Sequence, residues 1–345
     1  MPSFRHRCFA AWPLEENKCG RESMLERFLL ILVLSCAAVT TRADEAGPQT
    51  YRLAAGAEVA TFDTFQECAA CPEMIVLPMG SFMMGADPEE AEELRRFWPE
   101  MKAGEPPRFW YEGPPHPVLM DSPIAMGRNE VTNEEWMACV ADGACSHVPE
   151  RTMLRTLHEV VRIDDPRQPV ISVSFLDVLD YTAWLNDKTG SRAYRPPTEA
   201  EWEYAARSGT TTKFAQGETL TTGQGNFTLF RWFNGRAYAE PDRYGMPLPV
   251  DSLDAGNLWG LRHMSGNVSE WTMSCFTEPH LGLATSSAYY ELATAATSCW
   301  LVTKGGSYAG SREYARPAFR GRSKEDRRSR QLGFRVVRDL FEAAD

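Results

Sequence analysis

The stretch of sequence that most restricts the fold is Tyr194-Arg-Pro-Pro-Thr-Glu-Ala-Glu-Trp-Glu-Tyr-Ala-Ala-Arg207. Trp202, Ala205 and Ala206 in it have the spacing of one apolar helix face. Thr198 and Glu201 have the spacing of a capping box, in which each side chain binds the other residue's free backbone N–H. We therefore predict a helix that begins after Thr198, buries Trp202 and ends at Ser208-Gly209.

Two further capping boxes lie upstream, in Thr132 with Glu135 and in Ser174 with Asp177. Each of them predicts the start of another helix. After the second box, large apolar residues recur every three or four positions, which is typical of one buried helix face. These residues are Phe175, Val178, Tyr181, Trp184 and Leu185.

Strand signals are shorter and lie at the two ends of the chain. Residues 74–85 have the pattern of two short strands around a turn that contains proline and glycine. Two strand-like pieces, 304–308 and 332–338, close the chain. Between residues 209 and 300, glycine, asparagine and aspartate recur so often that we expect no regular element there. The acidic, proline-rich segment 86–115 is expected to be exposed to solvent.

The composition favours a fold that is rich in loops. The 345 residues include 25 glycines and 23 prolines, which set turns, and 10 tryptophans, which fill cores well. The formal net charge of −11 makes nucleic acid an unfavourable partner. A run of arginines between positions 312 and 330 is interrupted by acids and lacks an aromatic stacking pattern. No nucleic-acid partner is therefore expected.

The N-terminal region has the pattern of a secretory signal peptide. A basic residue precedes the apolar run 28–39, and a small residue, Ala43, precedes a polar stretch. We predict that residues 1–43 form this signal region, that Met24 is the true start and that cleavage follows Ala43. The apolar run is too short to span a bilayer, so no transmembrane span is expected. The predicted location is the bacterial periplasm, with lipid attachment at Cys36 as the alternative.

The cysteines after this region predict disulfides. Three of the nine cysteines lie within the signal region and six follow it, and an even number in an exported chain indicates pairing. Six cysteines allow many pairings, of which sequence neighbours are the simplest. A redox or metal-binding role of Cys68-Ala-Ala-Cys71 is also open, although no second pair at zinc spacing follows it. The pairs of sequence neighbours are Cys68–Cys71, Cys139–Cys145 and Cys275–Cys299.

Seven short segments, taken in this order, resemble the formylglycine-generating-enzyme (sulfatase-modifying factor) family. The resemblance extends over residues 70–340, after a leader at 44–69. It implies an α+β fold, with a single C-type-lectin-like domain that has a small antiparallel sheet, few helices and many ordered loops. The segments are 74–85, 129–136, 169–174, 194–207, 260–271, 305–308 and 333–337.

The oxidase of this family converts a sulfatase cysteine into formylglycine, with oxygen and a copper ion held by two cysteine thiolates. The resemblance assigns those two positions to Gly310 and Ala315 of this chain. Copper(I) prefers soft sulfur ligands, which neither residue provides. We therefore expect no copper, no copper-dependent formation of formylglycine and no catalytic residue at these two positions.

The remaining cleft candidates come from motif position: Ser307, Tyr308, Arg312 and Arg316. Their alternative role is structural, since a buried arginine often pairs with an acid to hold loops. Whether the chain is an enzyme stays open at this stage. The favoured function is an exported protein that binds or modifies a peptide or a small metabolite in a loop-built cleft. The alternatives are a formylglycine-generating oxidoreductase that uses Cys275 and Cys299, and a non-catalytic binding or scaffold module.

The resemblance also implies two calcium sites, and calcium suits the loops of an exported acidic protein. In the first site, the alternative is that the asparagine and aspartate side chains only cap turns. The second site departs from the family at His263, because calcium prefers oxygen ligands to imidazole. The first set is Asn226, Phe227, Asp242 and Tyr244, and the second is His263, Gly266, Val268 and Glu270.

Overall fold

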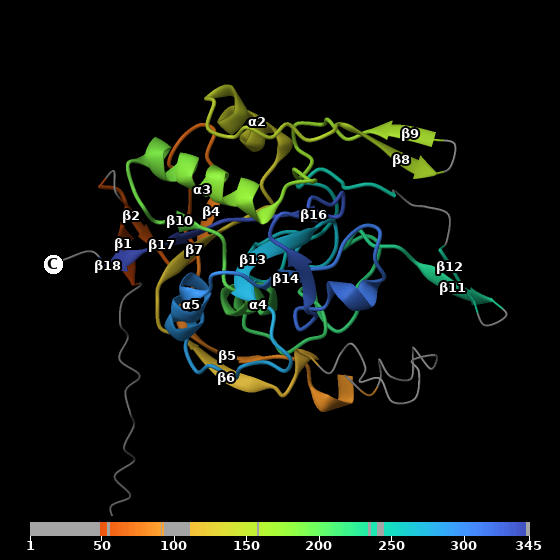
Figure 1. The fold of residues 1–345 in the computed structure, drawn as a ribbon. Helices are drawn as coiled ribbons and strands as arrows, with labels where there is room; N and C mark the ends of the chain where they lie inside the picture. Colours follow the sequence, from red (N-terminus) through yellow and green to blue (C-terminus); the bar gives the residue numbers. More distant parts are fainter. Residues whose placement is uncertain are drawn as a thin grey trace, which may run out of the picture. The chain divides into compact units, whose positions relative to one another are not determined.

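The computed structural model describes residues 49–53, 56–90, 92, 111–156, 159–233, 236–239 and 245–342 (Figure 1). All of them belong to the unit Ala46–Asp345. The predicted signal region, with Met24, Cys36 and Ala43, lies outside the described residues. Within the described part of the chain, no helix has the length and the apolar character needed to cross a membrane.

The three predicted helices are α2 (Asn133–Ala141), α3 (Phe175–Thr189) and α4 (Glu199–Arg207). Each begins at a complete capping box, in which the cap side chain and the acid three residues later bind each other's backbone N–H. Gly190, with φ of 64°, ends α3, and Ser208, with φ of 44°, ends α4. Because both ends are left-handed, the helices cannot continue. The helices predicted from the capping boxes are thus confirmed.

A five-stranded sheet joins the two ends of the domain. Its strands, in order, are β10 (Tyr194–Arg195), β17 (Val337–Asp339), β7 (Ile124–Gly127), β4 (Met74–Val76) and β3 (Thr64–Phe65). All neighbours in it are antiparallel. β3 lies at one edge, and β17 brings the C-terminal region between β10 and β7.

A four-stranded sheet lies beside the segment that holds the cleft candidates. Its strands, in order, are β15 (Gly321–Lys324), β14 (Trp300–Lys304), β13 (Ser269–Cys275) and β16 (Leu332–Gly333). β13 and β16 run parallel, whereas the other neighbours are antiparallel. The strand expected over 304–308 is wrong beyond Lys304. There Gly305 and Gly306, with φ of 87° and 67°, turn the chain.

The other strands form small antiparallel sheets, so the domain has several such sheets and not one. Together with the few helices and the long loops, they confirm the α+β class and the lectin-like organisation that the sequence implies (Figure 1). These strands are β1 (Thr50–Arg52) with β2 (Glu58–Ala60) and β18 (Phe341–Glu342), β5 (Gly80–Met84) with β6 (His116–Met120), β8 (Thr152–Thr156) with β9 (Glu159–Arg162), and β11 (Phe230–Phe233) with β12 (Arg236–Ala239).

Two regions for which the sequence predicted no helix or strand contain such elements. The leader contains β1, β2 and β3, and β1 pairs with β18 at the other end of the chain, a contact that no local pattern reveals. The region between 209 and 300 contains β11, β12, β13 and α5 (Ser286–Ala295). In α5 only Ser286 and Tyr289 are buried, so this helix has almost no apolar periodicity that sequence reasoning could use.

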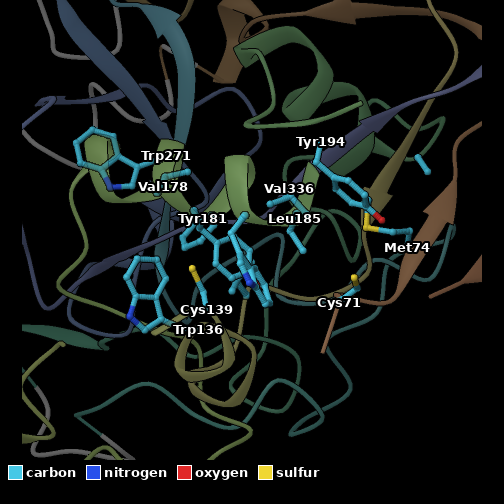
Figure 2. Packing of buried hydrophobic residues seen from close by; sticks show 14 of the residues in the cluster. Cys71, Met74, Trp136, Cys139, Val178, Tyr181, Leu185, Tyr194, Trp271 and Val336 are labelled. Carbon is cyan, nitrogen blue, oxygen red and sulfur yellow. The ribbon is translucent and has the colours of Figure 1, made fainter. Parts of the chain in front are cut away.

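Aromatic side chains fill the main core (Figure 2). Trp136 of α2 stacks on Tyr181 of α3 with ring centroids 5.7 Å apart, and Tyr181 meets Phe334 edge-on at 5.3 Å. The indole N–H of Trp136 donates to the carbonyl of His147, and that of Trp271 donates to the carbonyl of Val173. Each buried ring contributes roughly 2–3 kcal/mol by its transfer from water. This core fixes the loops that build the site.

Candidate functional site

The segment to which the resemblance assigns the family's two cysteine positions runs from β14 to β15 as a loop and a short 3-10 turn, Arg312–Ala315. At Gly310, a Cβ atom would lie 3.3 Å from Cδ2 of Tyr314 and 3.5 Å from the carbonyl oxygen of Ser307. Ala315 is fully buried in a small apolar cluster with Phe214, Leu220 and Phe227. Neither position offers a group that could hold a metal ion.

A polar pocket of about 180 Å³ lies beside this segment. Two of the cleft candidates, Arg312 and Arg316, line it, together with Glu313 between them. The opposite lining comes from the loop 213–219, which the sequence did not mark as part of a site. The lining residues are Glu90, Lys213, Phe214, Glu218, Thr219, Arg312, Glu313 and Arg316.

The other two cleft candidates do not line this pocket. Ser307 is buried, and its hydroxyl donates to Oε1 of Gln331 at 3.0 Å. Tyr308 is also buried, and its hydroxyl donates to the carbonyl of Arg330 at 3.2 Å. Burial raises the pKa of Tyr308 to about 12, so the phenol stays neutral at physiological pH. Both side chains hold loops together here.

Arg316 forms a wall of the pocket. Its guanidinium donates to both carboxylate oxygens of Glu112, at 2.8 and 2.9 Å, and to Glu90 at 2.7 Å. Its Nε donates to the carbonyl of Glu313. Glu112 is 1% exposed, so the expectation that segment 86–115 is a solvated surface is wrong at this residue. Burial raises the pKa of Glu112, and Arg316 opposes that shift.

Arg312, unlike the buried Arg316, is half exposed to solvent. Its side chain is 49% exposed, and Nε donates to Oε1 of Glu313 at 3.1 Å. Glu313 is largely buried, with 8% of its surface exposed. An exposed guanidinium beside a buried carboxylate leaves charged groups of both signs facing the pocket.

A network of buried ion pairs near the pocket joins Lys304 of β14 to glutamates of α4 and to Arg320. Nζ of Lys304 lies 3.0 Å from Glu203 and 3.9 Å from Glu199. Glu203 also accepts from Arg207, and Glu199 accepts from Arg320. Burial opposes ionisation of Glu203, but Lys304 and Arg207 outweigh it and lower its pKa to about 2.

The network is balanced in charge. Lys304 also acts electrostatically on Glu112, so the groups around Arg316 belong to the same set. The sequence signal for this network was the glutamate at every second position of α4, next to the buried Trp202. Sequence reasoning did not use this signal. The carboxylates are Glu90, Glu112, Glu199 and Glu203, and the cations are Arg207, Lys304, Arg316 and Arg320.

Half of the first predicted calcium set can be placed. Asn226 is buried, and its Nδ2 donates to the carbonyl of Met246 at 2.9 Å and to Oδ1 of Asn267 at 3.1 Å. Phe227 belongs to the apolar cluster around Ala315. Asp242 and Tyr244 lie outside the described residues. The first calcium site therefore stays a prediction.

The donor set of the second predicted calcium site does not suit calcium. Both oxygens of Glu270 accept from Arg335, at 2.6 and 2.7 Å, and one also accepts from Nε1 of Trp202. His263 is fully buried, and among the described residues neither ring nitrogen has a hydrogen-bond partner. Burial, with Arg262 and Arg335, lowers the pKa of His263 to about 3.

The other two members of this set are buried backbone positions. A Cβ atom on Gly266 would lie 2.6 Å from the carbonyl oxygen of Asn226, and Val268 is fully buried. Since both oxygens of Glu270 already bind Arg335 and His263 supplies no oxygen ligand, the side chains of this set do not fit a calcium ion.

The structure pairs the six cysteines as sequence neighbours. The bond between Cys275 and Cys299 ties the end of β13 to the start of β14. The bond between Cys139 and Cys145 is buried. Every cysteine in the described part of the chain is therefore disulfide-bonded.

Comparisons with known sequences support the resemblance. A family model, the Sulfatase-modifying factor enzyme 1-like domain, matches residues 60–340. The formylglycine-generating enzyme of Mycobacterium tuberculosis is 37% identical over 185 residues, which are 51% of this chain and 59% of that protein. The inactive C-alpha-formylglycine-generating enzyme 2 of Mus musculus is 31% identical over 170 residues, 49% of this chain and 48% of that protein. The chain thus spans about half the length of these relatives.

Solved structures agree with this assignment. PvdO from Pseudomonas aeruginosa matches with a TM-score of 0.59 and 29% identity, over 82% of this chain and 100% of that chain. The Treponema denticola variable protein 1 matches with a TM-score of 0.57 and 19% identity, over 80% of this chain and 98% of that chain, which supports the fold alone. Since the family model covers well over half of the sequence, the chain belongs to the sulfatase-modifying factor family of formylglycine-generating-enzyme-like proteins.

Proposed function

We propose that this chain binds a peptide or a small metabolite in the pocket beside Arg312, and that it does not make formylglycine by copper chemistry. The observation that carries the proposal is the segment Ser307–Ala315. Neither position that the resemblance assigns to copper-binding cysteines has a sulfur, and Ala315 is packed among apolar side chains. A polar pocket with charges of both signs borders the same segment.

The charges of the pocket favour a ligand that also carries both signs. Arg312 offers a half-exposed guanidinium, and Glu218 and Glu313 offer carboxylates. Peptides and amino-acid derivatives carry amino and carboxylate groups that would complement such a lining. Arg316 is held by Glu112 and Glu90, so its expected role is to keep the wall in place.

One relative supports a role other than copper oxidation. The mouse protein that is 31% identical over 170 residues is named as inactive. The named inactivity also favours a second candidate function, a binding module without catalysis. We further propose export to the bacterial periplasm, on the basis of the signal pattern and the disulfides. In that compartment, peptides would be accessible as ligands.

The pocket can be tested by binding. Short peptides that carry both a basic residue and a carboxylate would be titrated against the purified protein by calorimetry. Arg312→Gln should weaken the tightest of them about tenfold, the effect of one lost charged hydrogen bond. Arg322→Gln is a matched control, since Arg322 is equally exposed and also pairs with one glutamate, yet lies outside the pocket. Equal affinities for wild type and Arg312→Gln would refute the pocket assignment.

A further inference from the structure

The loop Cys68-Ala-Ala-Cys71 lies far in sequence from the segment at Arg312 and connects β3 to β4. Its two cysteines differ in their surroundings. Cys71 is fully buried and belongs to the main core cluster (Figure 2). Cys68 is only partly buried, and Ala69 beside it is exposed. The disulfide therefore has one cysteine nearer the surface, Cys68, which packs against the core cluster from its edge, and one beneath it.

This disulfide constrains the chain very little. Its sulfurs belong to residues only three positions apart, whereas Cys275 and Cys299 are 24 positions apart. The stabilisation from cross-linking grows with the length of the closed loop, so the short loop gains least. The loop is also held without the bond, since N–H of Cys71 donates to the carbonyl of Cys68 and Nε2 of Gln66 donates to the carbonyl of Cys71. Opening this disulfide should leave the domain folded.

The charges next to the loop do not oppose a thiolate. Glu67 accepts from Nε and Nη2 of Arg338, at 2.6 and 3.1 Å, and from the hydroxyl of Tyr194 at 2.7 Å. Glu73 accepts from Nη1 of Arg128 at 3.1 Å. The acids on either side of the two cysteines are thus each paired with an arginine. A thiolate at Cys68 would face compensated carboxylates, which removes the main local repulsion.

A second polar pocket, of about 400 Å³, borders the connection between β3 and β4 on either side of the cysteine pair, at Gln66 and Glu73. The residues that line it are Thr64, Phe65, Gln66, Glu73, Asn129, Glu135 and Arg167. Oδ1 of Asn129 is buried and has no hydrogen-bond partner among the described residues, so it is an acceptor that lacks a donor. A peptide backbone supplies N–H donors and C=O acceptors at regular spacing.

We propose that Cys68–Cys71 is a thiol–disulfide exchange site that oxidises a cysteine pair in a peptide bound in this second pocket. One peptide thiolate attacks Sγ of Cys68, the bond between Cys68 and Cys71 breaks, and Cys71 leaves as a thiolate that takes up a proton. The second peptide thiolate then attacks the mixed disulfide and releases Cys68. The peptide loses two electrons and two protons, and the protein disulfide, which is the oxidant, becomes two thiols.

The wild-type protein provides the first test. It would be incubated with reduced glutathione at rising concentration, quenched with acid and alkylated, and the cysteines would be mapped by mass spectrometry. Cys68–Cys71 should open about tenfold faster than the other two disulfides or more, with an unchanged near-ultraviolet circular dichroism spectrum. Simultaneous opening of all three disulfides, or opening only with loss of that spectrum, would overturn the proposal.

Single-cysteine variants provide the second test. The probe is a synthetic peptide with two cysteines in its oxidised form. Cys71→Ser should form a mixed disulfide with it through Cys68, whereas Cys68→Ser, with only the buried Cys71, should react about tenfold more slowly or less. Equal rates for the two folded variants would contradict the assigned roles.

The pocket is tested separately from the sulfurs. In the Cys71→Ser background, Asn129→Ala should slow the reaction with the peptide but not with 2-hydroxyethyl disulfide, which has no peptide group that could bind in the pocket. An equal effect on both reagents, or on neither, would remove the pocket from the proposal. Because the site does not involve Arg312, these outcomes are independent of the peptide-binding test for Arg312→Gln.

Discussion

The segment Ser307–Ala315 and the connection from β3 to β4, which contains Cys68 and Cys71, each border a polar pocket, and only the second contains sulfur. The first has glycine and alanine at the two positions to which the resemblance assigns copper-binding cysteines, and the second has a disulfide at a partly exposed position. Both lie on a backbone fixed by capping boxes, glycine turns and an aromatic core. The comparison teaches that the fold and the chemistry of this domain depend on different residues. Side chains in the loops can change while the capping boxes, glycine turns and aromatic core that fix the backbone stay the same.

The largest effect, a gain in copper(I) affinity, is expected when cysteines replace Gly310 and Ala315 in the segment Ser307–Ala315. Gly310→Cys with Ala315→Cys should give the protein a copper(I) site that wild type lacks, measured by competition with a chromophoric copper(I) chelator. The sulfur at 315 enters a packed apolar cluster and should cost about 1–3 kcal/mol of stability. A folded double variant with two free thiols and no gain in copper affinity would show that the two positions are wrongly assigned.

The next largest effect is a loss of stability, and it concerns the buried ion pairs of Lys304, close to the segment Ser307–Ala315. Lys304→Met should lower the free energy of unfolding by about 3 kcal/mol or more, because Glu203 and Glu199 stay buried with one cation fewer. Lys324→Met, at an exposed lysine of β15, should change it by less than about 0.5 kcal/mol. Urea unfolding measures both. A loss below about 1 kcal/mol in Lys304→Met would mean that the charge network does not hold this part of the backbone.

The third effect concerns stability in acid and depends on His263, which the resemblance places in the second calcium set. The unfolded imidazole binds a proton below its ordinary pKa of 6.5, whereas the folded one does so only near 3. Acid therefore favours the unfolded state across this window, by up to about 1.4 kcal/mol per pH unit. His263→Asn, which tolerates the positive φ of 56°, should reduce the loss of stability between pH 6 and 5 by about 1 kcal/mol. Equal slopes for the two proteins in urea unfolding would contradict this.

The smallest effect on stability is expected for the substitution of Arg312. Its ion pair with Glu313 is half exposed, so Arg312→Gln should change stability by less than about 0.5 kcal/mol, as should Arg322→Gln. The two variants should differ only in peptide binding. A stability loss above about 2 kcal/mol in Arg312→Gln alone would give this arginine a structural role and weaken the first pocket as a binding site.

Sequence reasoning found what local patterns encode. Capping boxes located α2, α3 and α4, because the cap and the acid are three residues apart and interact locally. It missed α5, whose stability comes from contacts with β13, β6 and α4 and not from an apolar stripe. It also missed β1 and its partner β18, since their pairing joins opposite ends of the chain. Short strands carry too little pattern to reveal such partners.

The candidate site shows the same difference between residues that local patterns reveal and residues that only the fold brings together. Motif position led to Arg312 and Arg316, which do line a pocket, but also to Ser307 and Tyr308, which hold loops. The facing loop at 213–219 could not be found from sequence, because nothing local ties it to residue 312. The role of Glu112 was mistaken for the same reason. Its acid-rich neighbourhood indicated a solvated surface, and only the fold brings Arg316 to it.

The central claim is that this family domain works without copper–thiolate oxidation, and one measurement addresses it directly. The purified protein would be incubated with a Cys-x-Pro-x-Arg peptide, copper and oxygen, and the peptide would be analysed by mass spectrometry, with an active formylglycine-generating enzyme as positive control. We predict no aldehyde in the presence of this protein while the control converts the peptide. Aldehyde formation that is abolished by Cys275→Ser would contradict the account and place the chemistry at Cys275 and Cys299.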